Sequence, residues 1–322
     1  MADVRRAARE WLGELEAHPG HSLFLVGLSG GGDSVALAWA LSKEADALGV
    51  TVGAVVVDHG LQEESAEVAR SAAAQAEELG LSPVVIKTVS VQPGGNIEER
   101  ARVARYRAFT EALRETGASG VVVAHSQDDQ AETVLLGLAR GSGPSGLKGM
   151  ARRDGHLHRP FLGLPRETLR QALTDAGLSW WEDPHNADDQ FSRVKVRQSI
   201  LPLMERDIGP GVSVSLARTA QLFREDSEEL DSHADAWFTH NAHSDDDGSW
   251  SVMVNELEKL GPALQSRVLR TLVVRAGGGP PTFVHTQHIV SLVTRWRGQS
   301  AVDVAGASVE RKDGRIVARK SA

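Results

Sequence analysis

Short apolar, valine-rich runs alternate with amphipathic stretches between residues 22 and 140. The runs are residues 22–28, 50–59, 82–91 and 120–125. The second and fourth are almost uninterrupted, as in strands buried on both faces of a parallel sheet. The stretches between them show helical spacing and each ends at a glycine, which favours a helix stop: residues 33–49, 63–80 and 96–117. The alternation predicts an α/β fold with a doubly wound, mostly parallel sheet.

A second pattern begins after Gly209-Pro210-Gly211, where glycine and proline interrupt regular structure. Residues 212–240 keep apolar positions at helical spacing and predict one long amphipathic helix. Residues 300–320 alternate weakly and predict a small terminal sheet. We therefore expect two domains: residues 1–210 with the α/β sheet, and a smaller, mainly helical domain at 211–322 that ends in a β element.

Composition narrows the class of protein. The length of 322 residues agrees with two domains, and 41% hydrophobic residues suffice for a core in each. No run approaches the roughly 18 apolar residues of a membrane span. Residues 1–20 are charged throughout and predict a helix, not a signal peptide. We expect a cytoplasmic protein without a membrane segment.

The net charge of −8 hides a strong local separation of charge. Residues 140–170 hold seven Lys/Arg and two acidic residues. Residues 225–258 hold eleven acidic residues and no Lys/Arg, whereas residues 263–322 hold ten Lys/Arg and three acidic residues. A single basic run is usually ordinary solvated surface, but this separation favours a local surface for a polyanion.

A glycine loop follows the first apolar run, with the sequence Ser29-Gly30-Gly31-Gly32-Asp33-Ser34. A glycine loop between a strand and a helix exposes backbone N–H groups at the helix N-terminus, which binds phosphate. Asp33 occupies the position of the lysine in the P-loop of NTPases, and the G-x-G-x-x-G dinucleotide motif is absent in register. The alternative is a glycine-rich turn with an Asp/Ser helix cap.

This loop resembles the SGGxDS loop of the PP-loop ATP-pyrophosphatase family, whose members cleave ATP between the α and β phosphates within a Rossmann-like fold. Further motifs extend the resemblance: Val57-Asp58-His59-Gly60-Leu61, Asn96-Ile97-Glu98-Glu99-Arg100-Ala101-Arg102 with Arg105-Tyr106, His125-Ser126-Gln127-Asp128-Asp129-Gln130-Ala131-Glu132-Thr133, Arg140-Gly141-Ser142-Gly143, Gly146-Leu147-Lys148-Gly149-Met150, Arg159-Pro160, Glu182-Asp183-Pro184-His185-Asn186, Arg193 and Arg197. In this order the set is similar to the tRNA(Ile)-lysidine synthase family, over about residues 22–206.

The resemblance implies a reaction. ATP adenylates O2 of the wobble cytidine in a tRNA(Ile) with a CAU anticodon, and the ε-amine of free L-lysine then attacks C2. The products are lysidine, AMP and pyrophosphate. The implied ligands are therefore ATP with Mg²⁺, lysine and the tRNA. The sequence leaves a homodimer open.

The resemblance also implies residue roles. The ATP-binding residues would be Ser29, Gly30, Gly31, Gly32, Asp33, Ser34, Asp58 and His59, with Asp33 as a Mg²⁺ ligand. The catalytic residues would be Asp33, Arg105, His125 and Asp129, and the lysine-binding residues would be Asp129 and Glu132. The tRNA-binding residues would be Lys148, Arg193, Lys195, Arg197, Arg311 and Lys312.

The residue types fit these roles, and each has a plainer alternative. If a helix begins at His125, then His125 and Asp129 lie on one of its faces at the carboxyl end of a parallel strand, where α/β sheets bind ligands. Asp129 and Glu132 could bind the amino groups of lysine and help to deprotonate the attacking amine. A histidine there can instead be packed, Asp128 and Asp129 can be helix N-terminal charges, and Arg105 can be solvated.

Two departures from the family pattern concern substrate contacts. Gln62 stands where an arginine usually follows Asp-His-Gly-Leu, and Val194 and Lys195 interrupt an arginine-rich segment. Trp180-Trp181 could stack a base but more often such a pair packs in a core. His233, His240 and His243 could suggest a metal site, although acidic surface helices often carry isolated histidines.

Two rival functions remain: another PP-loop tRNA-modifying or amide-forming ligase, and a nucleotide-binding sensor without chemistry. The chain has no cysteine. That absence excludes disulfides, cysteine-ligated iron–sulfur clusters and a cysteine nucleophile. Relatives that deliver sulfur to tRNA generally need a cysteine persulfide or such a cluster, so the amine-transferring branch is favoured.

Overall fold

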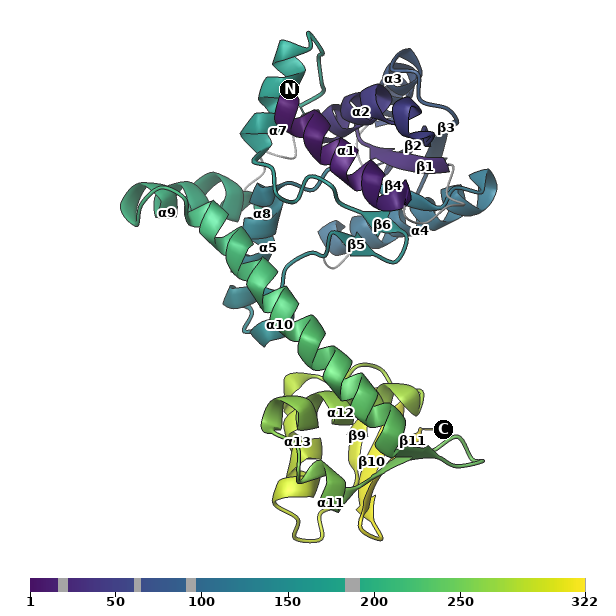
Figure 1. Cartoon of the computed structure of the whole chain (residues 1–322), viewed down its shortest axis with the longest axis vertical. Helices are drawn as coiled ribbons and strands as arrows, with labels where there is room; N and C mark the ends of the chain where they lie inside the picture. The colour runs from purple at the N-terminus through teal and green to yellow at the C-terminus, as the bar shows by residue number, and fades with distance from the viewer. Residues whose placement is uncertain (17–22, 61–64, 91–96, 183–191, 322) are drawn as a thin grey trace. The chain divides into compact units, whose positions relative to one another are not determined.

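The computed structural model describes residues 1–16, 23–60, 65–90, 97–182 and 192–321. The chain forms two compact units, Met1–Arg224 and Glu225–Ala322 (Figure 1). The first unit carries a six-stranded sheet in the order β3-β2-β1-β4-β6-β5. Its strands are β1 (Leu23–Leu28), β2 (Thr51–Asp58), β3 (Val84–Thr88), β4 (Gly120–Val122), β5 (Arg153–Asp154) and β6 (Leu157–His158). All neighbouring pairs are parallel except β5 with β6.

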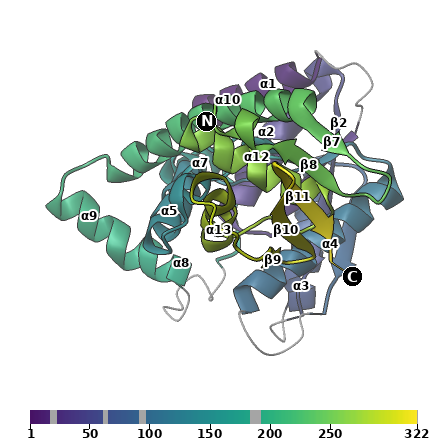
Figure 2. The ribbon, with the colours of Figure 1, turned by 90° about the horizontal axis from the view of Figure 1, so that it is seen from below.

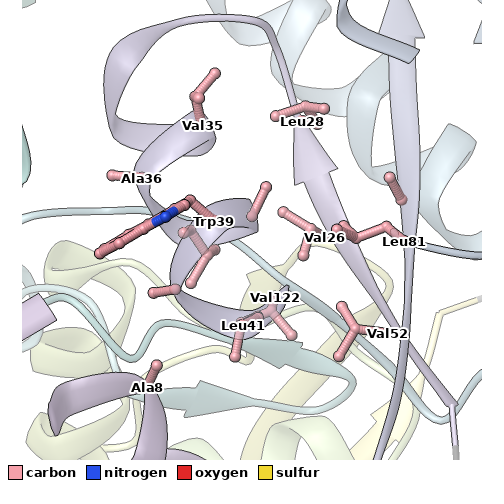
Figure 3. Packing of buried hydrophobic residues seen from close by; sticks show 14 of the residues in the cluster. Ala8, Val26, Leu28, Val35, Ala36, Trp39, Leu41, Val52, Leu81 and Val122 are labelled. Atoms are coloured by element: carbon pink, nitrogen blue, oxygen red, sulfur yellow. The ribbon is translucent and has the colours of Figure 1, made fainter. Parts of the chain in front are cut away.

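Helices cover both faces of this sheet, which confirms the predicted doubly wound fold. Phe24 and Val26 of β1 pack on one face with α1 (Ala2–Glu16), α2 (Gly32–Glu44), α3 (Ser65–Glu78) and α7 (Arg166–Asp175), and Figure 3 shows part of this core. Leu25, between them in sequence, packs on the other face with Phe109 of α4 (Ile97–Thr116). Alternation of side chains along a strand produces this division.

Packing of α4 on this second face of the sheet requires a glycine at position 27 of β1. A Cβ atom at Gly27 would lie 3.0 Å from Cζ of Phe109 and 3.1 Å from Cγ1 of Val123. The glycine therefore belongs to the packing of α4 on the sheet and not to the nucleotide loop that follows it.

The chain reverses its direction across the sheet between β1 and β4. From β1 it proceeds outward through β2 to β3, and α4 then returns it to β4 on the other side of β1. The loops after β1 and β4 therefore diverge, and α/β proteins bind ligands in the crevice that this switch point creates. Both motifs with candidate chemistry, residues 29–34 and 125–132, follow these two strands.

A smaller apolar cluster completes the first unit. Ala131 of α5 (Gln127–Ala139) packs with Val196 and Leu201, and Leu216 lies against them. The other elements here are α6 (Gly143–Leu147), α8 (Ser192–Lys195), a π-helical turn (Val196–Ile200) and α9 (Leu201–Asp207). Helix α10 (Val212–Asn241) begins in the first unit and ends in the second. The single long helix predicted at 212–240 is confirmed by α10.

The second unit contains an antiparallel sheet in the order β7-β8-β11-β10-β9. Its elements after α10 are β7 (Ala242–Ser244), β8 (Trp250–Met253), α11 (Val254–Leu257), α12 (Pro262–Arg275), α13 (Phe283–Thr294), β9 (Val302–Val304), β10 (Ala307–Lys312) and β11 (Arg315–Lys320). Helices α12 and α13 lie beside this sheet, as Figure 2 shows. The predicted terminal sheet is confirmed and is joined by β7 and β8. Among the described residues, no helix is long and apolar enough to cross a membrane.

Candidate active site

The loop of residues 29–34 connects the end of β1 to the start of α2. Gly30 has φ +80°, a left-handed conformation that favours glycine. Ser34 fixes the loop from inside, because its Oγ accepts from Ser29 N at 3.2 Å and donates to Gly31 O at 2.8 Å. The helix thus begins directly at the loop, with the backbone geometry that suits a phosphate group.

The two adjacent tryptophans pack against this loop. Trp181 N donates to Gly30 O at 2.9 Å, and a Cβ atom at Gly32 would lie 3.3 Å from Cδ1 of Trp180. Trp180 is half-buried against the main core. The packing alternative is therefore confirmed for Trp180, and its indole forms a wall beside the loop.

Asp33 lies in the first turn of α2 and faces Arg166. Arg166 Nε donates to Asp33 Oδ2 at 3.1 Å, and the Asp33 side chain is 26% exposed. Burial raises the pKa of Asp33, while the charge of Arg166 opposes this effect. Arg166 also forms ion pairs with the carboxylates of Asp129 and Glu132.

Asp129 has two roles at the start of α5. Its Oδ2 accepts from Ser126 N at 2.9 Å and from Ser126 Oγ at 2.8 Å, which closes a capping box with Ser126 as the N-cap. Its Oδ1 accepts from Arg166 at 2.9 Å and from Arg197 at 3.2 Å. Burial alone raises the pKa of Asp129, but Arg166 and the other cationic partners outweigh it and hold this pKa at about 2.

Glu132 is fully buried one turn later on α5. Its carboxylate accepts from Arg193 Nε at 2.9 Å and Arg197 Nε at 2.7 Å, and Arg166 Nη1 lies 3.5 Å away. Arg193 and Arg197, predicted to bind tRNA, are therefore engaged with the two carboxylates predicted to bind lysine. Lys195, between them in sequence, is exposed, whereas Val194 is buried.

Arg166 is the site residue that sequence reasoning missed. It bonds to Asp33 and Asp129 at once and lies near Glu132, and these three carboxylates raise its pKa. It was included only as one charge in the basic run 140–170. No spacing signal could reveal it, because its partners come from segments separated by more than thirty residues in sequence.

His125 precedes α5 and does not belong to it, because the helix begins at Gln127. The prediction that His125 and Asp129 share a helix face required a helix that begins at His125, and that start is wrong. The two side chains still interact electrostatically. Arg159, only 3% exposed, donates from Nε to Nδ1 of His125 at 3.3 Å. Burial lowers the pKa of His125 to about 3. The neutral ring accepts at Nδ1 and thus carries its proton on Nε2.

Asp58 is the last residue of β2, the strand beside β1, and His59 follows it. Asp58 is buried and accepts from Gly60 N at 3.0 Å. Burial, reinforced by the charge of Arg105, lowers the pKa of His59 to about 4. His59 Nδ1 is buried and has no hydrogen-bond partner among the residues that the structure describes. Arg105 itself is exposed on α4.

The remaining predicted residues lie on both units. Lys148 is half-buried after α6, and its carbonyl accepts from Arg224 at 2.8 Å. In the second unit, Arg311 donates to Leu292 O at 3.0 Å at the end of α13 and lies over the Trp296 ring, 5.4 Å from its centroid. Lys312 is exposed and lines a surface concavity of about 400 Å³ with Arg315, Arg319 and His243.

Of the three histidines considered as a metal site, His233 and His240 lie on α10, whereas His243 lies on β7. His233 pairs with Glu229 at 3.0 Å, and the described residues contain no group of three or more His, Cys, Asp or Glu that could hold a metal ion. Gln62 and residues 183–186 lie outside the described residues.

Comparison with known proteins agrees with this geometry. Residues 4–204 match the PP-loop domain family, and residues 254–317 match the TilS substrate binding domain. The chain is 49% identical over 293 residues to a tRNA(Ile)-lysidine synthase of Leifsonia xyli subsp. xyli, covering 91% of this chain and 88% of that protein. It is 44% identical over 320 residues to the one from Thermobifida fusca, covering 98% and 97%.

A solved structure supports the fold alone. The U34-tRNA thiolase NcsA from Methanococcus maripaludis, with its [4Fe-4S] cluster, superposes with a TM-score of 0.56 at 20% identity, over 70% of this chain and 79% of that one. This chain has no cysteine with which to ligate such a cluster. The predicted PP-loop fold and the predicted resemblance are thereby confirmed, and the chain belongs to the tRNA(Ile)-lysidine synthase family of PP-loop enzymes.

Proposed function

We propose that this chain ligates lysine to C2 of the wobble cytidine in a CAU-anticodon tRNA(Ile), through an adenylated cytidine, with release of AMP and pyrophosphate. One observation carries the proposal. A phosphate-binding glycine loop and a buried carboxylate pair, Asp129 and Glu132, meet at the switch point of the sheet. A nucleotide and a cationic co-substrate could thus be bound side by side.

The glycine loop supplies the ATP site. Backbone N–H groups at the start of α2, arranged by Ser29, Gly30, Gly31, Gly32 and Ser34, would hold the pyrophosphate. Asp58 and His59, at the end of the neighbouring strand, would complete the site. The unpartnered Nδ1 of His59 suits a hydrogen bond to bound nucleotide.

Asp33 fits a Mg²⁺ ion shared with the phosphates. Its carboxylate is a hard oxygen donor at the loop and is partly exposed, so water can complete the coordination shell. Mg²⁺ is often held by one or two carboxylates and the substrate phosphates, and an all-protein cage is not needed. When bound, the ion would neutralise charge that develops on the leaving phosphates.

Asp129 and Glu132 would hold the amino groups of lysine. Lysine is largely protonated near neutral pH, so buried carboxylates favour its binding. Before the attack on C2 one proton must leave the ε-ammonium group, and a carboxylate within hydrogen-bond reach can accept it.

His125 would act as a neutral hydrogen-bond donor. With a pKa of about 3 it is uncharged at neutral pH and is too weak a base to remove a proton from lysine. Its Nε2–H can instead stabilise negative charge on the phosphate of the adenylated cytidine or of departing AMP. The charge of Arg105 lowers the pKa of His59, and Arg105 would add positive potential to this part of the site.

For tRNA we propose contacts from Lys148, Lys195 and Lys312, with Arg193 and Arg197 beside the anticodon loop. The second unit would bind the tRNA body. We place the reaction in the cytoplasm, where ATP, lysine and tRNA occur together. Sedimentation of the purified chain will distinguish a monomer from a homodimer.

The decisive experiment incubates the purified chain with ATP, Mg²⁺, lysine and a tRNA(Ile) transcript bearing a CAU anticodon. We expect pyrophosphate release and a modified nucleoside whose mass matches lysidine. The matched control transcript carries uridine at the wobble position and should remain unmodified. Pyrophosphate release that needs tRNA but another amine would favour a different ligase, and no release under any condition would favour the sensor.

A further inference from the structure

Three carboxylates and three arginines form one cluster at the active site. The carboxylates are Asp33, Asp129 and Glu132, and the arginines are Arg166, Arg193 and Arg197. Their formal charges cancel. Among the described residues, the side-chain partners of Arg193 and Arg197 lie on α5, whereas Arg166 also bonds to Asp33 in the nucleotide loop.

The backbone holds Arg166 in this central position. Arg166 N donates to Asp128 Oδ2 at 2.8 Å, and Leu164 O accepts from Gln127 N at 2.9 Å. Leu169 and Leu173 then anchor α7 in the main core. The backbone of Arg166 is therefore fixed in position, and only 14% of its side-chain surface is exposed.

The proposed substrates need the same oxygen atoms. A Mg²⁺ ion at Asp33 would compete with the Nε bond of Arg166, and the ammonium groups of lysine would compete with its bonds to Asp129 and Glu132. Arg166 and both cations thus share the same carboxylate oxygens as partners. A cluster that is already neutral attracts a further cation weakly.

We propose that Arg166 is a positioning residue that couples the nucleotide site to the lysine site. The inference rests on the proposed function and implies that MgATP binds before lysine. When MgATP binds, the ion competes for Asp33 and the phosphates attract the guanidinium group, since arginine pairs strongly with phosphate. Asp129 and Glu132 then lose one neutralising partner and bind lysine more tightly. By linkage, lysine raises the affinity for MgATP by the same factor.

Calorimetric titration of lysine into the full-length chain tests this coupling, with and without MgATP and with tRNA left out. We expect MgATP to raise the affinity of the wild-type protein for lysine about tenfold, within the usual range of coupling between sites. In Arg166→Gln this factor should fall to about one. Without nucleotide, the variant should bind lysine at least as tightly as the wild type, because the competing cation is gone.

Two variants control for charge and for folding. Arg170→Ala removes a positive charge one turn later on α7, where Arg170 acts on Asp33 through its charge alone among the described contacts, so it should keep the coupling. Arg166→Lys retains the charge but lacks the planar fork, and we expect partial coupling. Thermal unfolding of each variant shows whether the fold is intact, and a folded Arg166→Lys keeps the test valid if Arg166→Gln unfolds.

Each outcome decides a separate point. Coupling that persists in Arg166→Gln, or loss of lysine binding in that variant while it remains folded, would overturn the role of Arg166 and leave the proposed function standing. No lysine binding to the wild type, even with MgATP, would instead contradict the proposed lysine site.

Discussion

At the scale of single residues, Glu132 shows how stability and binding depend on the same contacts. Its carboxylate is fully buried and accepts hydrogen bonds from Arg193 and Arg197, with Arg166 close by. A buried carboxylate is tolerated only because these guanidinium groups replace water. A residue that we propose to bind a substrate cation therefore also holds α8 against α5.

Glu132→Gln should destabilise the protein strongly. The substitution leaves partly buried guanidinium groups without their counter-charge, and removal of one partner from a buried ion pair typically costs about 3 kcal/mol. Urea unfolding measures the change in the free energy of unfolding. The matched control is Glu111→Gln, whose carboxylate is 54% exposed and pairs with Arg107 at 3.9 Å, and it should cost less than about 0.5 kcal/mol. Equal losses in the two variants would contradict this account.

His125 should make stability depend on pH below neutrality. Its pKa falls from an ordinary 6.5 to about 3 on folding, so between these values the unfolded chain binds more protons than the folded one. The free energy of unfolding is therefore unaffected by protonation of His125 above pH 6.5. It decreases as the pH falls toward 3, by up to about 1.4 kcal/mol per pH unit. His125→Gln should flatten the dependence of unfolding free energy on pH between 6.5 and 4. An unchanged slope would show that folding does not lower the pKa of the wild-type ring.

Sequence patterns predicted most of the site residues but not how they pair. Motif order placed Asp33, His125, Asp129 and Glu132 together, since strand ends of a parallel sheet share an edge. The assignment of Arg193 to tRNA alone missed its bond to Glu132, because a charge pattern does not reveal which side of a helix faces a buried acid. Arg166 was missed for the same reason.

At the scale of elements, the start of α5 is the part of the fold most directly tied to function. Ser126 caps this helix and is fully buried, and the same hydrogen bonds orient the Asp129 carboxylate toward Arg166. Long periodic helices and the valine-rich strands of the main sheet were predictable. The pairs β5–β6 and β7–β8 were not, because strands of two to four residues carry too little periodicity.

Ser126→Ala should affect both the helix and the lysine site. Loss of an N-cap costs about 1 kcal/mol. Asp129 also loses the bond from Ser126 Oγ to its Oδ2, while the bond from the backbone N–H of residue 126 remains. We expect lysine affinity to fall by about tenfold for each 1.4 kcal/mol of lost orientation. Thr282→Ala removes the equivalent cap of α13 and should lower stability similarly without changing lysine affinity. Unaltered lysine binding in Ser126→Ala would separate the cap from the site.

At the scale of the whole molecule, the chain separates its chemistry from its basic surface. The residues that we propose to bind ATP and lysine lie in the first unit, whereas the net-basic segment 263–322 lies in the second. Arg311 donates a hydrogen bond to the end of α13 and lies over the Trp296 ring. A substitution of Arg311 would therefore change the stability of this unit as well as any contact with RNA. Lys312 and Arg315 line the concavity of the second unit and are the better probes.

The double variant Lys312→Glu with Arg315→Glu should weaken tRNA binding and leave the nucleotide site intact. Each lost phosphate contact reduces the slope of log affinity against log salt by about one, so the variant should lose about two units of slope. Filter binding of the tRNA at several salt concentrations measures this, and calorimetry of MgATP provides the second readout. Lys259→Glu reverses an exposed charge that pairs with Glu256 elsewhere in the same unit, and it should change neither quantity strongly. If the double variant kept the wild-type slope, the concavity would not contact phosphate, and the tRNA surface would have to be sought around Lys148 and Lys195.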